Sequence, residues 1–386
     1  MNKPTQRFSS LVHRLDDQAR ANRRRQLSVH QGDGTGLIDA GGNRLINFGS
    51  NDYLGLVADS IATVSSETLG ATASPLVCGW SPEHERLRDA ICHLEQTESA
   101  VVFASGYAAC SGTIATLAID GDLILSDQLN HASLIDGCRL ARSQTVVYPH
   151  RDVNFVDDHL RRYRGEYREV WLVTDSVFSM DGDVAPLIPL IEIASRYNAY
   201  LVVDEAHATG VLGDRGSGLC EAMGVADRVD VRIGTLSKAV GCQGGFAAGP
   251  KVVIDTLIQS CRSLIFSTAL SPVIANAACG IVELLPRMAD RRRRVAEHAK
   301  RLREGIAAHV KHDPIEQAIP IVPVITGSDL SALQASERLH YQGCWVPAIR
   351  PPTVPRDQSR LRISLSAAHD CEQISRLIDA LSALPD

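Results

Sequence analysis

A chain of 386 residues is too long for one small core, so its length predicts about two or three domains, or one large α/β unit with a smaller appendage. The formal net charge of −6 provides no basic surface field, which excludes nucleic acid and anionic membranes as expected partners. The ten cysteines are scattered singly, without a CxxC pair or a Cys/His cluster at zinc spacing, so we expect thiols in a reducing compartment and no metal site.

The N-terminal stretch shows no targeting signal. It reads "MNKPTQRFSSLVHRLDDQARANRRRQ" and lacks the apolar core of a secretory signal, while Asp16 and Asp17 argue against an acid-poor transit peptide. No apolar run approaches the ~18 residues needed to span a bilayer. We therefore expect a cytoplasmic protein.

The chain changes character along its length. The first 45 residues predict an amphipathic helix and then a short hairpin in "QGDGTGLIDAGGNRLINF". From about residue 99, segments with helical spacing separate short apolar runs, which are "SAVVFAS", "DLILSD", "TVVYP", "EVWLVTD", "AYLVVDE", "VRIGTLS" and "GGFAAG". This alternation predicts an α/β fold with a mostly parallel sheet covered by helices on both faces. Ligands of such sheets bind at the carboxyl ends of the strands.

From about residue 272 the sequence becomes strongly helical and then mixed. We therefore expect an N-terminal helix and hairpin arm (1–45), a large cofactor-binding domain (46–272) and a smaller α+β C-terminal domain (273–386). The run Arg291 to Arg294 lies beside Asp290 and Glu297, which indicates a solvated helix face.

Asp204 ends the apolar run "AYLVVDEAHATG", and His207 follows three residues later. A carboxylate at this end of a strand faces the expected ligand site, and its burial is costly unless a cation or a hydrogen bond compensates. A helix cap or a structural ion pair would explain Asp204 equally well when it is considered alone.

Lys238 follows the next strand in "IGTLSKAVGCQGG", among small and uncharged neighbours. Most lysines are simply solvated. However, a lysine that forms an imine and a carboxylate that pairs with a pyridinium nitrogen are the two protein groups that pyridoxal 5'-phosphate (PLP) most needs. Asp204, His207 and Lys238 together therefore favour a PLP site.

The phosphate of such a cofactor needs a cradle of donors. In "FASGYAACSGTIATLA", a strand ends and Gly106 opens a helix, so that free N–H groups and the helix dipole can face an anion. Thr235 and Ser237 can add hydroxyl donors. A glycine at a strand-to-helix turn is common, so this signal alone is weak. His131, in "DQLNHASLIDG", starts another helix, and it fits a cap, a core position or the face of the cofactor ring.

These segments resemble the α-oxoamine synthases, a family of PLP enzymes of fold type I. The resemblance rests on eight ordered stretches: "NFGSNDYLGL", "FASGYAA", "DQLNHASLIDG", "VFSMDGDVAPL", "VVDEAHATGVLG", "GTLSKAVGCQGG", "IFSTALSP", and "AIRPPTVP" followed by "RLRISLSAAH". They run in order from about residue 20 to 370. The order and the number of these stretches make the resemblance specific.

The resemblance implies a role for individual cofactor-site residues. Lys238 matches the imine-forming lysine and Asp204 the partner of the ring nitrogen. The other matching positions are His207 near the ring hydroxyl, His131 on the ring face, Gly106, Tyr107 and Thr235 at the phosphate, and Ser179 in the cofactor shell.

The resemblance also implies substrate and subunit contacts. Arg23 and Thr353 match substrate-binding positions, and Arg362 matches the arginine that holds the amino-acid carboxylate. Ser267 and Thr268 match the segment that reaches the phosphate of the neighbouring subunit, so a homodimer is expected.

A few positions depart from the family pattern. Pro75 stands where relatives often carry arginine or glycine, Arg88 replaces a common glutamate, and Asp175-Ser176 stands where Glu-Gly is frequent. None of them removes a group that the chemistry needs, but Pro75 alters the loop at 70–80, which in this family lies near the acyl substrate.

Within the family, the motifs most resemble those of the members that condense L-alanine with a pimeloyl thioester in biotin biosynthesis. The acyl group would come from CoA or from an acyl carrier protein. In this chemistry the freed Lys238 amine removes the Cα proton, the carbanion attacks the thioester, CoA leaves and CO2 is lost.

The sequence leaves other readings open. One is a glycine-using member of the family. Only the stretch "AIRPPTVP" favours the alanine-using members instead. Another is a catalytically silent PLP-binding or scaffold protein, against which the set of Lys238, Asp204, His207 and Arg362 argues.

Overall fold

A computed structural model describes residues 7–32, 34–57, 68–306 and 318–384. The chain divides into two compact units. The central unit comprises Asn51–Ala296, and the terminal unit combines Met1–Ser50 with Glu297–Asp386. Within the described parts of the chain, no helix is both long enough and apolar enough to cross a membrane.

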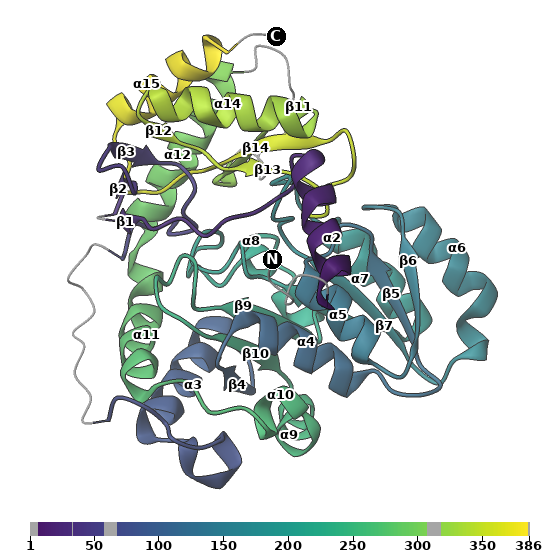
Figure 1. Ribbon diagram of the computed structural model, residues 1–386. Coiled ribbons are helices and arrows are strands. Elements are labelled where there is room, and N and C mark those ends of the chain that lie inside the picture. The colour runs from purple at the N-terminus through teal and green to yellow at the C-terminus, as the bar shows by residue number, and fades with distance from the viewer. Residues whose placement is uncertain (1–6, 33, 58–67, 307–317, 385–386) are drawn as a thin grey trace. The chain divides into compact units, whose positions relative to one another are not determined.

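The central unit is built on one sheet (Figure 1). Its strands follow the order β4-β10-β9-β8-β7-β5-β6 among the described residues. Strands β5 to β9 pair in parallel, and β10 runs antiparallel to both β4 and β9. This confirms the predicted mostly parallel sheet. The strands are β4 Ser99–Phe103, β5 Leu123–Asp127, β6 Gln144–Tyr148, β7 Val170–Asp175, β8 Tyr200–Asp204, β9 Val231–Thr235 and β10 Gly245–Gly249.

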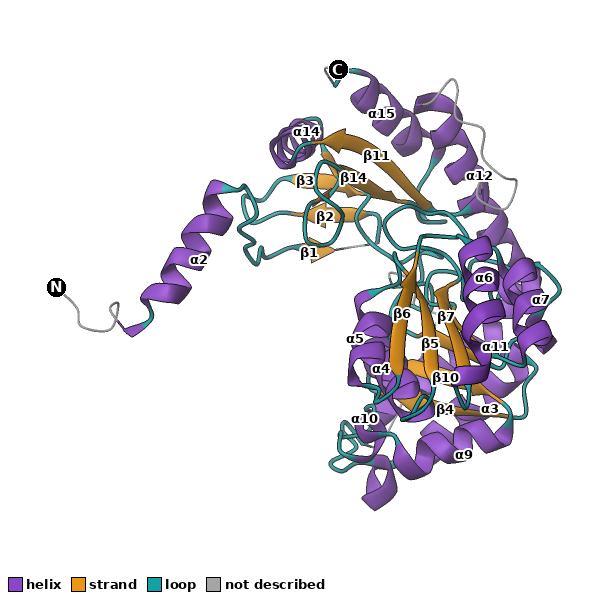
Figure 2. Ribbon diagram, turned by 90° about the vertical axis from the view of Figure 1, so that its right-hand side faces the viewer, coloured by secondary structure: helices purple, strands orange, loops and turns teal. Residues whose placement is uncertain are grey.

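Helices cover both faces of this sheet (Figure 2), with α4 and α5 on one side and α6 and α7 on the other. Every residue of β5, β7, β9 and β10 is buried, because a sheet covered on both faces leaves no strand face to water. The helices are α3 Pro82–Glu95, α4 Gly106–Leu117, α5 Ala132–Leu140, α6 Val153–Tyr163, α7 Leu187–Tyr197, α8 Leu219–Ala222, α9 Lys251–Ser260, α10 Arg262–Ile265 and α11 Pro272–Leu284.

Capping residues start the helices that follow the strands. The Ser105 hydroxyl accepts a hydrogen bond from the amide of Ala108 at 3.1 Å, and the Asp152 carboxylate accepts one from the amide of Phe155 at 3.0 Å. Such caps satisfy one donor of the first turn and leave others available. Because α4 and α5 follow β4 and β5 directly, their N-termini lie near the carboxyl ends of those strands.

The terminal unit holds the smaller sheets. One has the strand order β1-β2-β3-β12, and the other has the order β11-β14-β13. Their strands are β1 Gln31–Gly32, β2 Gly36–Ile38, β3 Arg44–Asn47, β11 Ile321–Gly327, β12 Cys344–Trp345, β13 Ala348–Ile349 and β14 Ser359–Ser364. The helices of this unit are α2 Ser9–Arg20, α14 Asp329–Tyr341 and α15 Cys371–Ser382, and α12 Ala289–Ile306 runs through the boundary between the units.

The prediction that Arg291 to Arg294 form a solvated face is wrong for the first two arginines. Arg291 donates to the carbonyl oxygen of Leu54 at 2.8 Å, and Arg292 is buried and donates to that of Leu285 at 2.6 Å. Arginine carries several donors in a fixed fork, so backbone carbonyls can satisfy it without a carboxylate. A charge count along the helix cannot reveal such acceptors.

Candidate active site

Acidic side chains gather at the carboxyl edge of the central sheet. Asp127, Asp175 and Asp204 are the last residues of β5, β7 and β8. Asp175 and Asp204 stand directly opposite each other in the parallel register, and both are buried. Two carboxylates so close cannot both ionise cheaply away from water. This edge therefore needs either a proton or a cation.

Asp204 is held through both carboxylate oxygens. Its Oδ1 accepts a hydrogen bond from the amide of Ala206 at 2.9 Å, and its Oδ2 accepts one from the Cys110 thiol at 3.1 Å. Its backbone carbonyl accepts hydrogen bonds from the amide and the hydroxyl of Ser176, both at 2.9 Å. The two donors to the carboxylate, a backbone amide and a thiol, are neutral, so the buried carboxylate suits a positively charged partner.

Asp175 differs from Asp204 in charge. Burial and the negative charge of Asp204 raise the pKa of Asp175 well above its usual value, whereas the amide of His131 and the charge of Lys238 act in the opposite direction. Its Oδ2 accepts the hydrogen bond from the His131 amide at 2.6 Å. The neutral form of Asp175 is therefore favoured beside Asp204, and its side chain anchors the start of α5.

His131 caps α5 and is exposed. Its Nδ1 lies 2.7 Å from the Ser133 hydroxyl. Surrounding protein atoms lower the pKa of His131, the charge of Lys238 lowers it further, and the charge of Asp204 opposes both. The charges of Asp204 and Lys238 thus both act on His131, and the assignment of the three residues to one cofactor site stays a prediction.

Lys238 lies on the loop that joins the antiparallel strands β9 and β10. Hydrogen bonds close this loop: the amide of Leu236 donates to the Gly244 carbonyl at 3.0 Å, and the amide of Gly241 donates to the Lys238 carbonyl at 2.9 Å. Gly244 has φ of +122°, a conformation that residues with a side chain rarely adopt. The glycines thus fix the path of the backbone on which Lys238 stands.

His207 is buried and pairs with a tyrosine. Its Nδ1 lies 2.8 Å from the hydroxyl of Tyr53, and the Tyr53 hydroxyl donates to Oδ1 of Asn51 at 3.0 Å. This contact fixes the orientation of the imidazole ring beside the end of β8.

The start of α4 packs tightly against the loop that bears Lys238. A Cβ on Gly106 would lie 3.0 Å from the hydroxyl oxygen of Thr235, and a Cβ on Gly245 would lie 2.5 Å from Cα of Gly106. The hydroxyls of Thr235 and Ser237 both donate to the Gly244 carbonyl, at 3.0 and 3.2 Å. With their protons engaged in this way, the two hydroxyls border a compact corner in which the free N–H groups of the first helical turn are suited to an anion.

Tyr107 and Ser179 occupy different surroundings. The Tyr107 hydroxyl donates to the Asp136 carboxylate, which raises the pKa of Tyr107, and its ring lies 6.5 Å from that of His131, centroid to centroid. Ser179 lies in the turn closed by the hydrogen bond from the amide of Gly182 to the Phe178 carbonyl at 2.9 Å.

His150 packs against the turn that contains Ser179. Its Nδ1 lies 2.9 Å from Asp127 and its Nε2 lies 2.8 Å from Asp183. Burial lowers the pKa of His150, but the two carboxylates outweigh this effect and raise the pKa to about 9. The ring also packs edge-on against Phe178 at 4.4 Å.

Ser267 and Thr268 follow α10 in the central unit. The segment is tied to another loop by the hydrogen bond from the amide of Ala269 to the Ala73 carbonyl at 3.0 Å. Ser267 is half-buried and Thr268 is exposed.

The predicted substrate residues belong to the terminal unit. Arg23 forms an ion pair with Asp329, with Nε 2.7 Å from the carboxylate, and the Thr353 hydroxyl lies 3.4 Å from a guanidinium nitrogen of Arg25. Arg362 is buried in β14, and its Nη1 donates to the Ser364 hydroxyl at 2.7 Å.

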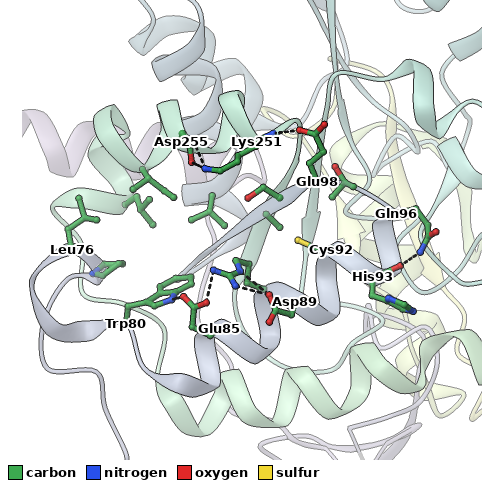
Figure 3. A pocket seen from close by; sticks show the side chains of 18 residues that line it. Leu76, Trp80, Glu85, Asp89, Cys92, His93, Gln96, Glu98, Lys251 and Asp255 are labelled. Atoms are coloured by element: carbon green, nitrogen blue, oxygen red, sulfur yellow. Dashed lines mark hydrogen bonds and ion pairs between the residues drawn. The ribbon is translucent and has the colours of Figure 1, made fainter.

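A cavity of about 1070 Å³ lies elsewhere on the central unit (Figure 3). Trp80 and Asp89 lie on one side of it, and Lys251 and Asp255 of α9 lie on the other. None of the predicted site residues lines it. Pro75 and Arg88, which depart from the family pattern, do line it. Pro75 begins a short π-helix, Pro75–Gly79, and Arg88 pairs with Glu85 at 2.6 Å.

The sequence analysis missed Tyr53 and Cys110 as neighbours of site residues. Tyr53 lies in "NFGSNDYLGL", one of the stretches that carry the family resemblance, and Cys110 directly follows another, "FASGYAA". Tyr53 contacts His207 across 154 positions and Cys110 contacts Asp204 across 94 positions. Spacing along the chain gives no sign of such contacts.

Comparisons with known proteins agree with this arrangement. The family model described as aminotransferase class I and II matches residues 43–381. The 8-amino-7-oxononanoate synthase of Anaeromyxobacter sp. (strain K) is 43% identical over 357 residues, which cover 91% of this chain and 89% of the relative. The 8-amino-7-oxononanoate synthase 2 of Bacillus subtilis (strain 168) is 40% identical and covers 97% of each chain.

A solved structure shares the fold over the full length. A variant of serine palmitoyltransferase from S. paucimobilis with a bound PLP–myriocin aldimine matches with a TM-score of 0.91 and 27% identity, covering 99% of this chain and 98% of that one. The chain therefore belongs to the aminotransferase class I and II family, with the fold of the type I PLP enzymes.

The contact between Gly245 and Gly106 yields a stability prediction. In Gly245→Ala the new methyl group meets the backbone of the first turn of α4. We expect a loss of about 1–3 kcal/mol in the free energy of unfolding, measured by urea denaturation, because a packed site cannot absorb the extra volume.

Gly280→Ala is the matched control, since a Cβ at Gly280 in α11 meets nothing within 4 Å. This control should be neutral or more stable by up to about 1 kcal/mol, because alanine favours the helix. Equal unfolding free energies for the two variants would refute the close approach.

Proposed function

We propose that this chain catalyses the PLP-dependent decarboxylative condensation of L-alanine with a pimeloyl thioester. The products are 8-amino-7-oxononanoate, CO2 and the free thiol carrier, CoA or an acyl carrier protein. The curated relatives that match about nine-tenths of the chain at 40–46% identity carry the name of this synthase. The observation that carries the proposal is the cluster of Lys238, Asp204 and His131 at the carboxyl edge of the sheet.

The residues of the central unit fit PLP. The buried Asp204 carboxylate has neutral donors on both oxygens and suits a protonated ring nitrogen. The corner formed by Gly106, Thr235 and Ser237 suits a phosphate. Lys238 supplies the amine that can tether the cofactor. PLP, when bound, accepts the electron pair released at the α-carbon of the amino acid.

Lys238 acts as tether and as base in this proposal. Once L-alanine had taken its place, the freed amine would remove the α-proton of alanine. Asp204 would hold a protonated ring nitrogen, and His131 would contact the ring of the cofactor. His207, oriented by Tyr53, would interact with the ring hydroxyl.

The remaining predicted residues serve the phosphate and the substrates. We assign Tyr107 to the phosphate, Ser179 to the cofactor shell, and Arg23 and Thr353 to substrate binding. Arg362 holds the alanine carboxylate, for which a guanidinium provides two parallel donors. Because Arg362 fixes the carboxylate of the amino acid, the volume of the substrate pocket decides which amino-acid side chain is accepted.

We also propose a homodimer, in which Ser267 and Thr268 reach the phosphate of the neighbouring subunit. Large apolar side chains near this segment are exposed, including Phe266 at 71% and Val77 at 77%. A cluster of exposed apolar side chains is typical of a protein–protein interface. Sedimentation of the holoenzyme as an active monomer at micromolar concentration would refute the dimer.

The cytoplasm is the proposed location. All ten cysteines are free thiols, as expected in a reducing compartment. Export of the active protein with paired cysteines would contradict this assignment.

A substrate panel tests the proposed function. Pimeloyl-CoA and acetyl-CoA are each offered with L-alanine and with glycine, and products are measured by mass spectrometry. We expect alanine with pimeloyl-CoA to react fastest. Glycine should react about 10- to 200-fold more slowly, because one methyl group in an apolar pocket contributes only a few kcal/mol. Acetyl-CoA should be poorer still, since each unburied methylene forfeits about 0.8 kcal/mol.

Lys238→Ala should lose product formation with every pair, whereas Lys251→Ala should retain it, because Lys251 is exposed and pairs with Asp255 at 2.6 Å. The alternative is a glycine-using member of the family, 2-amino-3-ketobutyrate CoA ligase or 5-aminolevulinate synthase, and a preference for glycine with acetyl-CoA would transfer the chain to the ketobutyrate branch.

A further inference from the structure

The Asp204 carboxylate is oriented by a thiol from a neighbouring helix. Cys110 stands in the second turn of α4, and its sulfur lies 3.1 Å from Oδ2 of Asp204. Both residues are buried, with exposed fractions of 2% and 3%. Water therefore cannot replace the thiol as a donor to this oxygen.

We propose that Cys110 is a positioning residue of the cofactor site, which holds the Asp204 carboxylate in the orientation that meets the ring nitrogen of PLP. This inference rests on the proposed function and extends it to a residue outside the predicted cofactor and substrate contacts. The amide of Ala206 holds the other oxygen at 2.9 Å, so rotation of the carboxylate would break both hydrogen bonds.

The Cys110 thiol donates a hydrogen bond to Asp204 and remains neutral. Burial and the charge of Asp204 raise the pKa of the Cys110 thiol well above its usual value, so the sulfur keeps its proton. A thiol is a weak donor. It can therefore fix the direction of the carboxylate while leaving most of the negative charge available to the ring nitrogen.

The position of Cys110 on α4 links both ends of the cofactor site. Gly106, four residues earlier, opens the same helix at the phosphate corner, so successive turns of α4 serve the phosphate and Asp204. Ser133 extends the link, because its hydroxyl lies 2.7 Å from His131 and also interacts with the Cys110 thiol. A change at Cys110 thus acts on the site through its hydrogen bond to Asp204 and also through Ser133.

PLP affinity tests the proposal. The full-length apo protein is titrated with PLP, and the dissociation constant is read from the visible absorbance of the bound cofactor. Cys110→Ala should weaken binding by about 3- to 10-fold, the usual effect of losing one hydrogen bond. Cys110→Ser keeps a donor and should restore the affinity to within about 2-fold of the wild type.

Cys138→Ala provides the matched control. Cys138 is also a buried thiol, on α5, and its hydrogen-bond partner is Ser126. This variant removes the same atom from the same core and should leave PLP affinity unchanged. Urea denaturation of all variants shows whether any affinity change merely follows lost stability.

The outcomes separate this inference from the proposed function. Wild-type affinity in Cys110→Ala, or equal weakening in Cys138→Ala, overturns the role of Cys110 while leaving the substrate panel unaffected. Failure of Cys110→Ser to restore binding in a stably folded variant also overturns it. Wild-type protein that binds no PLP overturns both proposals. Failure of the panel in a protein with the expected PLP affinities overturns only the proposed reaction.

Discussion

The negative charge of Asp204 at the buried end of β8 is the constraint around which the site is arranged. A carboxylate away from water is costly unless its neighbours compensate. Burial and the neighbouring Asp204 charge both raise the pKa of the adjacent Asp175, so that a second negative charge there is disfavoured. The Asp204 carboxylate thus accepts hydrogen bonds from two neutral donors, the Ala206 amide and the Cys110 thiol, and we propose that a protonated ring nitrogen supplies the positive charge.

The mostly parallel sheet makes this arrangement possible. Parallel strands end at the same edge, so Asp127, Asp175 and Asp204 lie in a row, and the helices that follow the strands bring their free N–H groups to that edge. The antiparallel return of β10 then closes the loop that carries Lys238. Close contact between Gly245 and Gly106 joins this loop to the start of α4.

The sequence predicted the parts that depend on local pattern. Each apolar run from "SAVVFAS" to "GGFAAG" forms a strand of the central sheet, because alternating strand and helix patterns require no knowledge of distant contacts. The position of Asp204 at the end of a buried strand was also visible in the sequence, whereas its role and that of Lys238 stay predictions.

The parts that depend on tertiary contacts were not predictable. Cys110 looks like any small core residue of a helix, and its role follows only from its distance to Asp204. Tyr53 becomes informative only through His207. Arg292 was misread because its acceptors are backbone carbonyls of other segments, which no charge pattern records.

The protonation state of the cofactor nitrogen tests this account most directly. The protein is reconstituted with PLP labelled with 15N in the ring, and the nitrogen resonance is recorded for the wild type and for Asp204→Asn. The account predicts a protonated nitrogen in the wild type and an unprotonated one in the variant, because the amide keeps the shape of the carboxylate without its charge. An unprotonated nitrogen in the wild type, or the same resonance in both proteins, would contradict it.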